Sequence, residues 1–220
     1  MLKLYGVARS RASRIIWVCH ELGLPFEQVP VIQAYRLADP DSADAPANTH
    51  SPWFRELSPA GAIPVIDDGG LVVSESLAST LYLARQYDAN GIGPVDAAED
   101  ALFMQWSFYA ATAIEPDALT LLFLHGRGQE QSGDDQALIA NAAERLIRPM
   151  TVLEGHLATH GNLVGNRFTV ADLNVAEIVR YAQGYGELME QFPAVVAWLA
   201  DCQARPAFQE MWAARTREPE

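Results

Sequence analysis

Ser10, Ser13 and Arg14 form a Ser-x-x-Ser-Arg pattern where a short strand-like segment runs into a helix-like one. Such a junction leaves the first helical N–H groups without partners and gives them a partial positive charge. The Ser10 hydroxyl can donate to an anion there, and Arg9 and Arg11 bring further positive charge to the same corner. One interpretation is therefore a pocket for a small acidic ligand. The other is that Ser10 only caps the helix and the arginines are solvated, which is common for serines at this position.

Two further segments could hold an extended, charged ligand. Pro64 opens a strand-like segment, and a cis bond before it would turn the Ile63 backbone outward to pair with a peptide. The alternative, a trans proline at the edge of a sheet, is the more frequent case. Glu75 and Ser76 begin a helix, whose first amides and Ser76 hydroxyl suit a carboxylate, while Glu75 could accept an ammonium. The alternative is an ordinary helix start with an acid in its first turn.

Other chemistry-bearing residues point to less. Trp106 and Tyr109 stand at helical spacing, where aromatic rings form a core more often than a substrate pocket. His156 and His160 are four residues apart, but the sequence HLATH lacks the Glu of a zinc-protease helix, so no metal site is expected. The glycine-rich dinucleotide and phosphate patterns and the G-x-S-x-G nucleophile pattern are absent, which argues against those enzyme classes.

The elements that would position these residues fall into two groups. Residues 1–87 predict the order strand, helix, strand, short helix, strand, strand, helix. Residues 88–97 (DANGIGPVDA) have no periodicity and are interpreted as a linker. The remaining residues carry only helix signals, near 98–124, 135–160, 170–183 and 193–203, with a short one near 206–214.

One helix start is unusually complete. Thr169 and Asp172 form a capping box, and Phe168 and Leu173 form a hydrophobic staple around it. Loss of such a cap costs about 1 kcal/mol, so we expect a role in folding.

Composition limits the partners. The chain has 220 residues, enough for one or two domains, and 28 acidic against 15 basic residues give a formal net charge of −13. Such a chain is repelled by nucleic acids and by anionic membrane surfaces. No secretory signal is recognised, and the apolar stretch 101–124 is interpreted as a kinked buried helix and not as a membrane span. Only two cysteines, Cys19 and Cys202, are present. We therefore expect the protein to lie in a reducing cytoplasm.

Four segments, in the same order along the chain, resemble those of soluble glutathione transferases. They are the strand–Ser10-x-x-Ser13-Arg14–helix junction and residues 58–65 (SPAGAIPV), 71–78 (LVVSESLA) and 165–172 (GNRFTVAD). The first resembles the serine-type, theta-like bacterial branch of that family. The resemblance implies an α/β, thioredoxin-like N-terminal domain over residues 1–87 and an all-α helical domain over residues 98–220.

The resemblance also implies a reaction. By position, Ser10 would donate its hydroxyl to the glutathione sulfur and so favour the thiolate, which would attack a hydrophobic electrophile. Trp106 and Tyr109 would then provide part of the apolar wall for that electrophile. Reduced glutathione is the implied co-substrate, and no metal is expected.

The remaining implied residues bind glutathione. Ile63, held by a cis Pro64, would pair its backbone with the cysteinyl part. Glu75 and Ser76 would hold the γ-glutamyl end, and His50 the glycine end. The resemblance further implies a homodimer. The alternative function is a non-catalytic relative that binds a protein partner, but such a module has no need for Ser10 and both γ-glutamyl contacts, which favours the enzyme.

Overall fold

The computed structural model describes residues 1–88, 90–128 and 132–218. The chain divides into two compact units, one made of Met1–Asn90 with Pro206–Glu220 and the other of Gly91–Arg205. The sequence analysis had assigned all residues after 97 to one helical domain. The structure differs at the end of the chain, because residues from Pro206 onward pack on the first unit.

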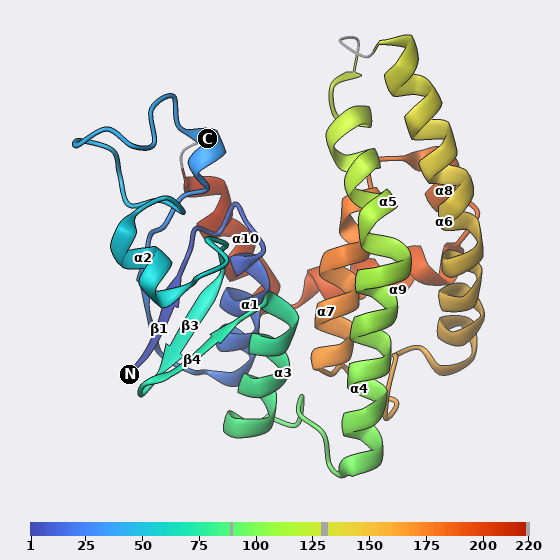
Figure 1. The fold of residues 1–220 in the computed structure, drawn as a ribbon. Helices are drawn as coiled ribbons and strands as arrows, with labels where there is room; N and C mark the ends of the chain where they lie inside the picture. Colours follow the sequence, from blue (N-terminus) through green and yellow to red (C-terminus); the bar gives the residue numbers. More distant parts are fainter. Residues whose placement is uncertain (89, 129–131, 219–220) are drawn as a thin grey trace. The chain divides into compact units, whose positions relative to one another are not determined.

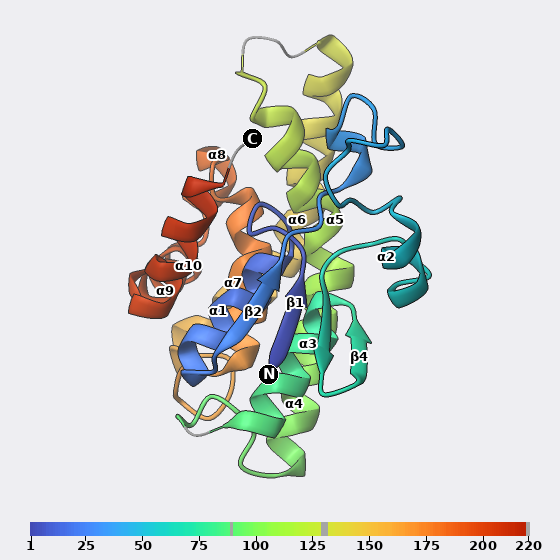
Figure 2. The ribbon, with the colours of Figure 1, turned by 90° about the vertical axis from the view of Figure 1, so that its left-hand side faces the viewer.

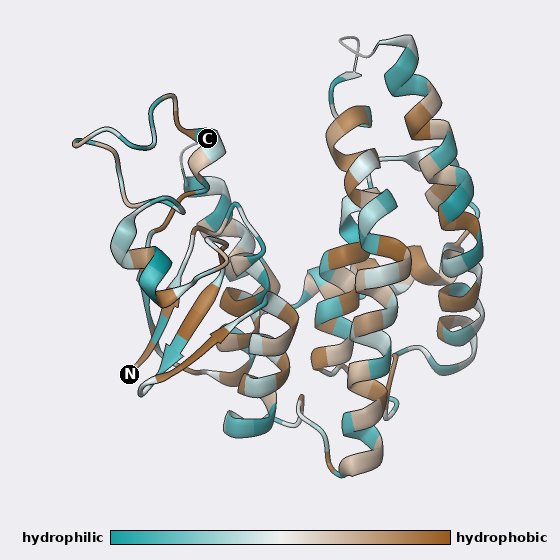
Figure 3. Ribbon diagram, viewed as in Figure 1, coloured by the Kyte–Doolittle hydropathy of each residue, from teal (hydrophilic) through white to brown (hydrophobic). Residues whose placement is uncertain are grey.

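The first unit is built on a four-stranded mixed sheet in the order β2-β1-β3-β4 (Figure 1). β1 (Leu2–Tyr5) pairs in parallel with β2 (Phe26–Val29) and antiparallel with β3 (Val65–Asp68). The hairpin closes with β4 (Leu71–Ser74), antiparallel to β3. Figure 3 shows β3 changing from hydrophobic to hydrophilic along its length, as it leaves the core for the hairpin turn.

Helices cover both faces of this sheet. α1 (Ala12–Leu22) and α3 (Ser76–Tyr87) lie on one face, and α2 (Pro52–Leu57) lies on the other (Figure 1). The apolar positions that predicted α1 are buried. Gly23 ends the helix in the left-handed conformation, with a φ of 63°. A single 3₁₀ turn, Ala34–Arg36, precedes α2. Phe54 of α2 is fully buried against Val65.

The register of the sheet decides where the candidate residues go. Tyr5 of β1 lies opposite Val65 of β3, and Val65 lies opposite Ser74 of β4. The residues that follow β1, precede β3 and follow β4 therefore all start from the same end of the sheet. These are the three segments that carried the candidate ligand contacts in the sequence.

The helix α10 (Pro206–Arg217) completes the first unit by packing on α1, and the two lie side by side in Figures 1 and 2. The Trp17 and Phe208 rings meet edge to face, with centroids 4.9 Å apart. Both rings and Met211 are buried. This apolar contact explains why α10 belongs to the first unit although it follows the second one in the sequence.

The second unit is helical. Its first helix, predicted over 98–124 with a kink, runs as α4 (Ala97–Tyr109), a π-helical turn (Ala110–Ile114), α5 (Glu115–Thr120) and another π-helical turn (Leu121–His125). Pro116 lies in the first turn of α5, where a missing N–H is tolerated. The rest comprises α6 (Gly133–His160), α7 (Val170–Val179), a 3₁₀ turn (Arg180–Ala182), α8 (Gly186–Met189) and α9 (Pro193–Ala204). Within the described ranges, no helix is long and apolar enough to cross a membrane.

The predicted capping box is present at the centre of this unit. Asp172 is fully buried and its Oδ2 accepts from the N–H and the hydroxyl of Thr169, at 2.9 and 3.0 Å. Its Oδ1 accepts from the Leu163 N–H and from Trp198 Nε1, both at 2.9 Å. Burial raises the pKa of Asp172 above its ordinary value, while the hydrogen bonds act in the opposite direction. The box therefore ties two other segments, that of Leu163 and α9 with Trp198, to the start of α7.

Candidate functional site

Ser10 lies in the turn between β1 and α1, where its hydroxyl makes two local hydrogen bonds. Its Oγ accepts from the Ala12 N–H at 3.0 Å and donates to the Val7 carbonyl at 2.7 Å. The N-cap of α1 is Arg11 and not Ser10, which the capping interpretation had expected, but the Ser10 hydroxyl still supports the start of the helix through the Ala12 N–H. Because the amide uses one lone pair of Oγ, the hydroxyl hydrogen can rotate toward another acceptor without movement of the oxygen.

Arg14 and Ser76 connect the first turn of α1 to the first turn of α3. The Arg14 side chain is buried, and its Nη1 donates to Ser76 Oγ at 2.9 Å. Arg14 is therefore not a solvated surface arginine. Since Ser76 Oγ accepts from a cation, its own hydrogen is directed to a different acceptor. A carboxylate bound at the start of α3 would be such an acceptor.

Glu75 is the residue before α3 and has an uncommon backbone conformation, with φ of 72° and ψ of 118°. A non-glycine residue with such angles costs on the order of 1–3 kcal/mol, and such residues concentrate at functional sites. The Glu75 carbonyl accepts from the Ser79 N–H and the Ser79 hydroxyl, at 2.9 and 3.0 Å, which holds the turn in place. The Glu75 side chain itself is exposed.

The Ile63–Pro64 peptide bond, just before β3, is cis, as the resemblance implied. Gly6, at the end of β1, has a φ of 144° and lies close to this segment. A Cβ on Gly6 would stand 3.3 Å from Cβ of Ala12 and 3.5 Å from Cβ of Ile63. The absence of a side chain at Gly6 therefore lets Ile63 approach the turn that carries Ser10.

One end of the sheet thus collects a hydroxyl, a backbone segment at the start of β3, an exposed carboxylate, a helix N-terminus and a buried guanidinium. This set suits an extended ligand that carries both an ammonium and a carboxylate, together with a group that needs a hydroxyl donor. In the described part of the chain, no cluster of three or more His, Cys, Asp or Glu residues is arranged to hold a metal ion.

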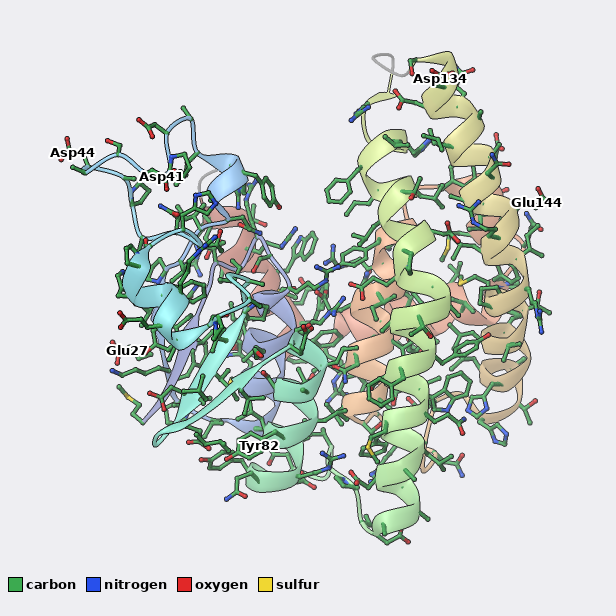
Figure 4. The ribbon with its side chains drawn as sticks, viewed as in Figure 1. Glu27, Asp41, Asp44, Tyr82, Asp134 and Glu144 are labelled. Atoms are coloured by element: carbon green, nitrogen blue, oxygen red, sulfur yellow. The ribbon has the colours of Figure 1, made fainter. Side chains whose placement is uncertain are left out.

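His50 lies on the loop before α2 and makes its hydrogen bonds within that loop. Its Nδ1 is 3.1 Å from Oδ1 of Asp41, and its N–H donates to Asn48 Oδ1 at 2.8 Å. Figure 4 shows Asp41 and Asp44 on this loop, with Asp44 at its outer tip. The loop is fixed from inside by the buried Asn48, so the position of His50 is defined by loop packing.

Trp106 and Tyr109, both on α4, lie in the helical unit. Trp106 is buried, and its ring centroid is 4.7 Å from that of His156 and 5.8 Å from that of Tyr109. Tyr109 is half-buried, and its hydroxyl donates to the Pro149 carbonyl at 3.3 Å. Both rings thus pack against α6. The more exposed aromatic rings are Phe108 and Phe123, at 59% and 62% exposure, and the sequence analysis had not selected them.

A second group that sequence reasoning missed follows α10. The Glu218 carboxylate accepts from the N–H groups of Ala8 and Arg9, at 2.7 and 2.9 Å, directly before Ser10. A single Glu after a helix carries no motif or period that would predict this contact. Cys19 of α1 is buried in the core of the first unit, and burial raises the pKa of its thiol to about 12.

Comparisons with known proteins agree with this architecture. Residues 4–91 match the family described as glutathione S-transferase, N-terminal domain, and residues 101–206 match glutathione S-transferase, C-terminal domain. Glutathione S-transferase 3 of Zea mays is 34% identical, covering 97% of this chain and 94% of its own.

Two solved structures extend the comparison. A glutathione transferase from Populus trichocarpa has a TM-score of 0.80 at 26% identity, covering 98% of this chain and 99% of its own. A theta-class enzyme from Xanthomonas axonopodis pv. citri, solved with glutathione bound, has a TM-score of 0.74 at 25% identity, covering 95% of both chains. The expected fold is confirmed: a thioredoxin-like N-terminal domain followed by a helical C-terminal domain.

Proposed function

The chain belongs to the glutathione S-transferase family and is a glutathione S-transferase, and from that premise we propose that Ser10 activates the thiol of its co-substrate glutathione for attack on a hydrophobic electrophile. One observation carries this proposal. The register of β1, β3 and β4 brings the Ser10 turn, the Ile63–Pro64 segment and the Glu75–Ser76 turn to the same end of the sheet.

The proposed chemistry starts from the acidity of a thiol. A thiol with a pKa of about 8.5 is only a few per cent ionised at neutral pH. A hydrogen bond from a neutral donor to a charged acceptor contributes about 1.5–3 kcal/mol, which corresponds to a pKa lower by roughly 1–2 units. In this proposal the Ser10 hydrogen leaves the Val7 carbonyl and donates to the sulfur, while Ala12 keeps Oγ in place. The proton of the thiol goes to solvent. The thiolate then forms the carbon–sulfur bond with its electron pair, while the bond from that carbon to the leaving group breaks and the leaving group departs to solvent with the bonding electrons.

Binding of the tripeptide is proposed for the residues around Ser10. The Ile63 backbone, set by the cis Pro64, would pair with the cysteinyl part. Ser76, whose oxygen already accepts from Arg14, would donate to the γ-glutamyl carboxylate, and Glu75 would accept its ammonium. His50 is proposed for the glycine end. The support for it is only its place on an ordered loop, where it pairs with Asp41.

An apolar wall is needed for the electrophile. We retain Trp106 and Tyr109 as proposed pocket residues, with Tyr109 the more accessible of the two because it is half-buried. The exposed rings of Phe108 and Phe123 are a second source of apolar surface on the same unit. Leucine substitutions at Tyr109 and at Phe108, assayed with electrophiles of different size, would separate the two sources through changes in KM for the electrophile.

Three further properties are proposed on the family relationship. The Ser10 turn supports assignment to the serine-type, theta-like bacterial branch, whereas the curated relatives found are mainly plant enzymes and a theta-class bacterial enzyme appears among the similar solved structures. A homodimer and a cytoplasmic location are proposed on the same basis. Size-exclusion chromatography with light scattering would test the dimer.

The test of the proposal measures the pKa of the thiol of bound glutathione. Thiolate absorbance in the ultraviolet, followed against pH, is compared for the unchanged protein, Ser10→Ala and the control Ser132→Ala. Ser132 also accepts an amide N–H at a helix start, at 3.1 Å from Asp135, but caps α6 in the other unit. We expect Ser10→Ala to raise the thiol pKa by about 1–2 units and Ser132→Ala to leave it unchanged.

Calorimetric titration with reduced glutathione completes the experiment. The Ser10→Ala protein should still bind glutathione, because the contacts at Ile63, Glu75 and Ser76 are retained. A thiol pKa that is identical in the Ser10→Ala and unchanged proteins would refute the role of Ser10. Absence of glutathione binding by the unchanged protein would refute the whole site.

A further inference from the structure

The helix α10 packs on α1 through residues of its first half. Phe208 contacts Trp17 and stacks on Trp212, with centroids 5.6 Å apart in the second pair. Oε2 of Glu210 in α10 lies 3.2 Å from Nδ1 of His20 in α1. The buried packing of Phe208 on Trp17 therefore determines the direction in which α10 leaves α1, and so the place where Glu218 lies.

Those residues arrive at the turn that carries Ser10. Oε1 of Glu218 accepts from the Ala8 N–H at 2.7 Å, and Oε2 accepts from the Arg9 N–H at 2.9 Å. Gln28 Nε2 also donates to Oε1, at 3.2 Å. A carboxylate is suited to this place because it has two acceptor oxygens and no hydrogen, so it can receive two adjacent amides at once.

The same turn is held a second time by α10. Arg215 Nη1 donates to the Ala8 carbonyl at 2.6 Å, and Arg9 Nε donates to the Arg215 carbonyl at 3.3 Å. Both backbone groups of Ala8 are therefore bonded to the C-terminal segment. Ala8 is fully buried, and Arg9 is followed directly by Ser10.

We propose that Glu218 is a positioning residue for the reaction: by holding the amides of Ala8 and Arg9, it fixes the turn from which the Ser10 hydroxyl reaches the glutathione sulfur. This inference rests on the proposed role of Ser10. Glu218 acts through geometry, because a negative charge near the sulfur would by itself disfavour the thiolate. Glu218 thus serves the reaction without touching the substrate.

The test is a double-mutant cycle read out by the pKa of the thiol of bound glutathione. It compares the unchanged protein, Glu218→Ala, Ser10→Ala and the double variant. We expect Glu218→Ala to raise the thiol pKa by roughly 0.5–1 unit, which is about a 3- to 10-fold loss of thiolate at a pH well below that pKa. In the Ser10→Ala background the same change should add almost nothing, because residues that act through one another are not additive.

Two further variants separate geometry from charge and from folding. Glu210→Ala breaks a contact between α10 and α1 but none at the turn, and should leave the thiol pKa unchanged. Glu218→Gln retains one acceptor oxygen and removes the charge. Loss of the charge alone would lower the thiol pKa, so a rise in the Gln variant indicates displaced geometry. Circular dichroism shows that each variant is folded.

The outcomes distinguish the two proposals. If Ser10→Ala raises the thiol pKa but Glu218→Ala does not, the positioning role is overturned and the role of Ser10 stands. Equal shifts for Glu218→Ala in both backgrounds, or a lower thiol pKa in Glu218→Gln, also overturn it, because Glu218 then acts independently of Ser10. If Ser10→Ala has no effect, both proposals fail together.

Discussion

Substitution of Asp172 by asparagine should destabilise the helical unit strongly, although the two side chains have almost the same shape. Each carboxylate oxygen accepts two hydrogen bonds, from Leu163 and Trp198 on one side and from the two donors of Thr169 on the other. In either orientation, the NH₂ group of the substituted side chain faces donors where an acceptor stood before. The change therefore leaves buried donors without acceptors instead of only removing a charge.

The magnitude follows from these contacts. Two hydrogen bonds to a charged group are lost, at about 1.5–3 kcal/mol each, which gives roughly 3–6 kcal/mol. Burial of the carboxylate opposes its ionisation, as the raised pKa of Asp172 indicates. Removal of the charge therefore offsets part of the free energy that is lost with the hydrogen bonds. We expect a net loss of about 2–4 kcal/mol in the free energy of unfolding.

Asp135→Asn provides the matched control, because Asp135 and Ser132 form the corresponding capping box of α6 on the surface. There water can satisfy the freed donors, and we expect a much smaller loss in the free energy of unfolding than at Asp172. The assay is urea unfolding followed by circular dichroism, with equal denaturant slopes required for the comparison. Equal losses at the two boxes would show that burial does not decide their contribution, and this reasoning would be wrong.

Three other changes have defined outcomes. Glu99→Gln should lower the free energy of unfolding at neutral pH and reduce the further loss on acidification. The hydrogen bonds from Arg167 hold the pKa of Glu99 below its ordinary value in the folded state. Their contribution to stability is therefore present above the unfolded-state pKa of about 4.3 and is lost as pH falls through the folded-state pKa. Urea unfolding across that pH range checks this, and parallel curves for the two proteins would contradict it. Arg14→Met should weaken glutathione binding about tenfold, or ~1.4 kcal/mol, with little change in the pKa of the bound thiol. An unaltered Kd by calorimetry would exclude the proposed effect of Arg14 on the γ-glutamyl contact. Gly6→Ala should lower Tm more than Gly69→Ala. Both glycines have a positive φ, but of the two only Gly6 has neighbouring atoms within 4 Å of the added Cβ. Equal shifts of Tm in thermal unfolding would argue against crowding as the cause.

Most of the fold follows from local patterns. The element order of residues 1–87, the interruption of the long helix near Pro116 and the capping box at Thr169 are all signalled by periodicity, Gly and Pro positions and cap residues. These signals are local because helix starts and ends are decided by nearby backbone groups. The pairing of α10 with α1 was not predicted, since it joins residues almost two hundred positions apart through an ordinary apolar face.

The candidate site was predictable in part for the same reason. Ser10, Pro64 and Glu75 are each marked by a local pattern, and sheet register then brings them together. Side-chain burial was not readable from type alone: Arg14 is buried although arginines are mostly exposed. The contact of Glu218 with the Ser10 turn depends on where α10 is anchored, which no short segment specifies.

The return of α10 to the first unit has a consequence for how the chain is made. A ribosome synthesises the whole helical unit between Asn90 and Pro206, which takes on the order of ten seconds at typical elongation rates. During that time the face of α1 around Trp17 lacks the cover that Phe208 and Met211 later provide. We therefore expect the nascent N-terminal unit to be a substrate for chaperones. Its final packing, and with it the Ser10 turn, becomes complete only after synthesis of the residues beyond α10.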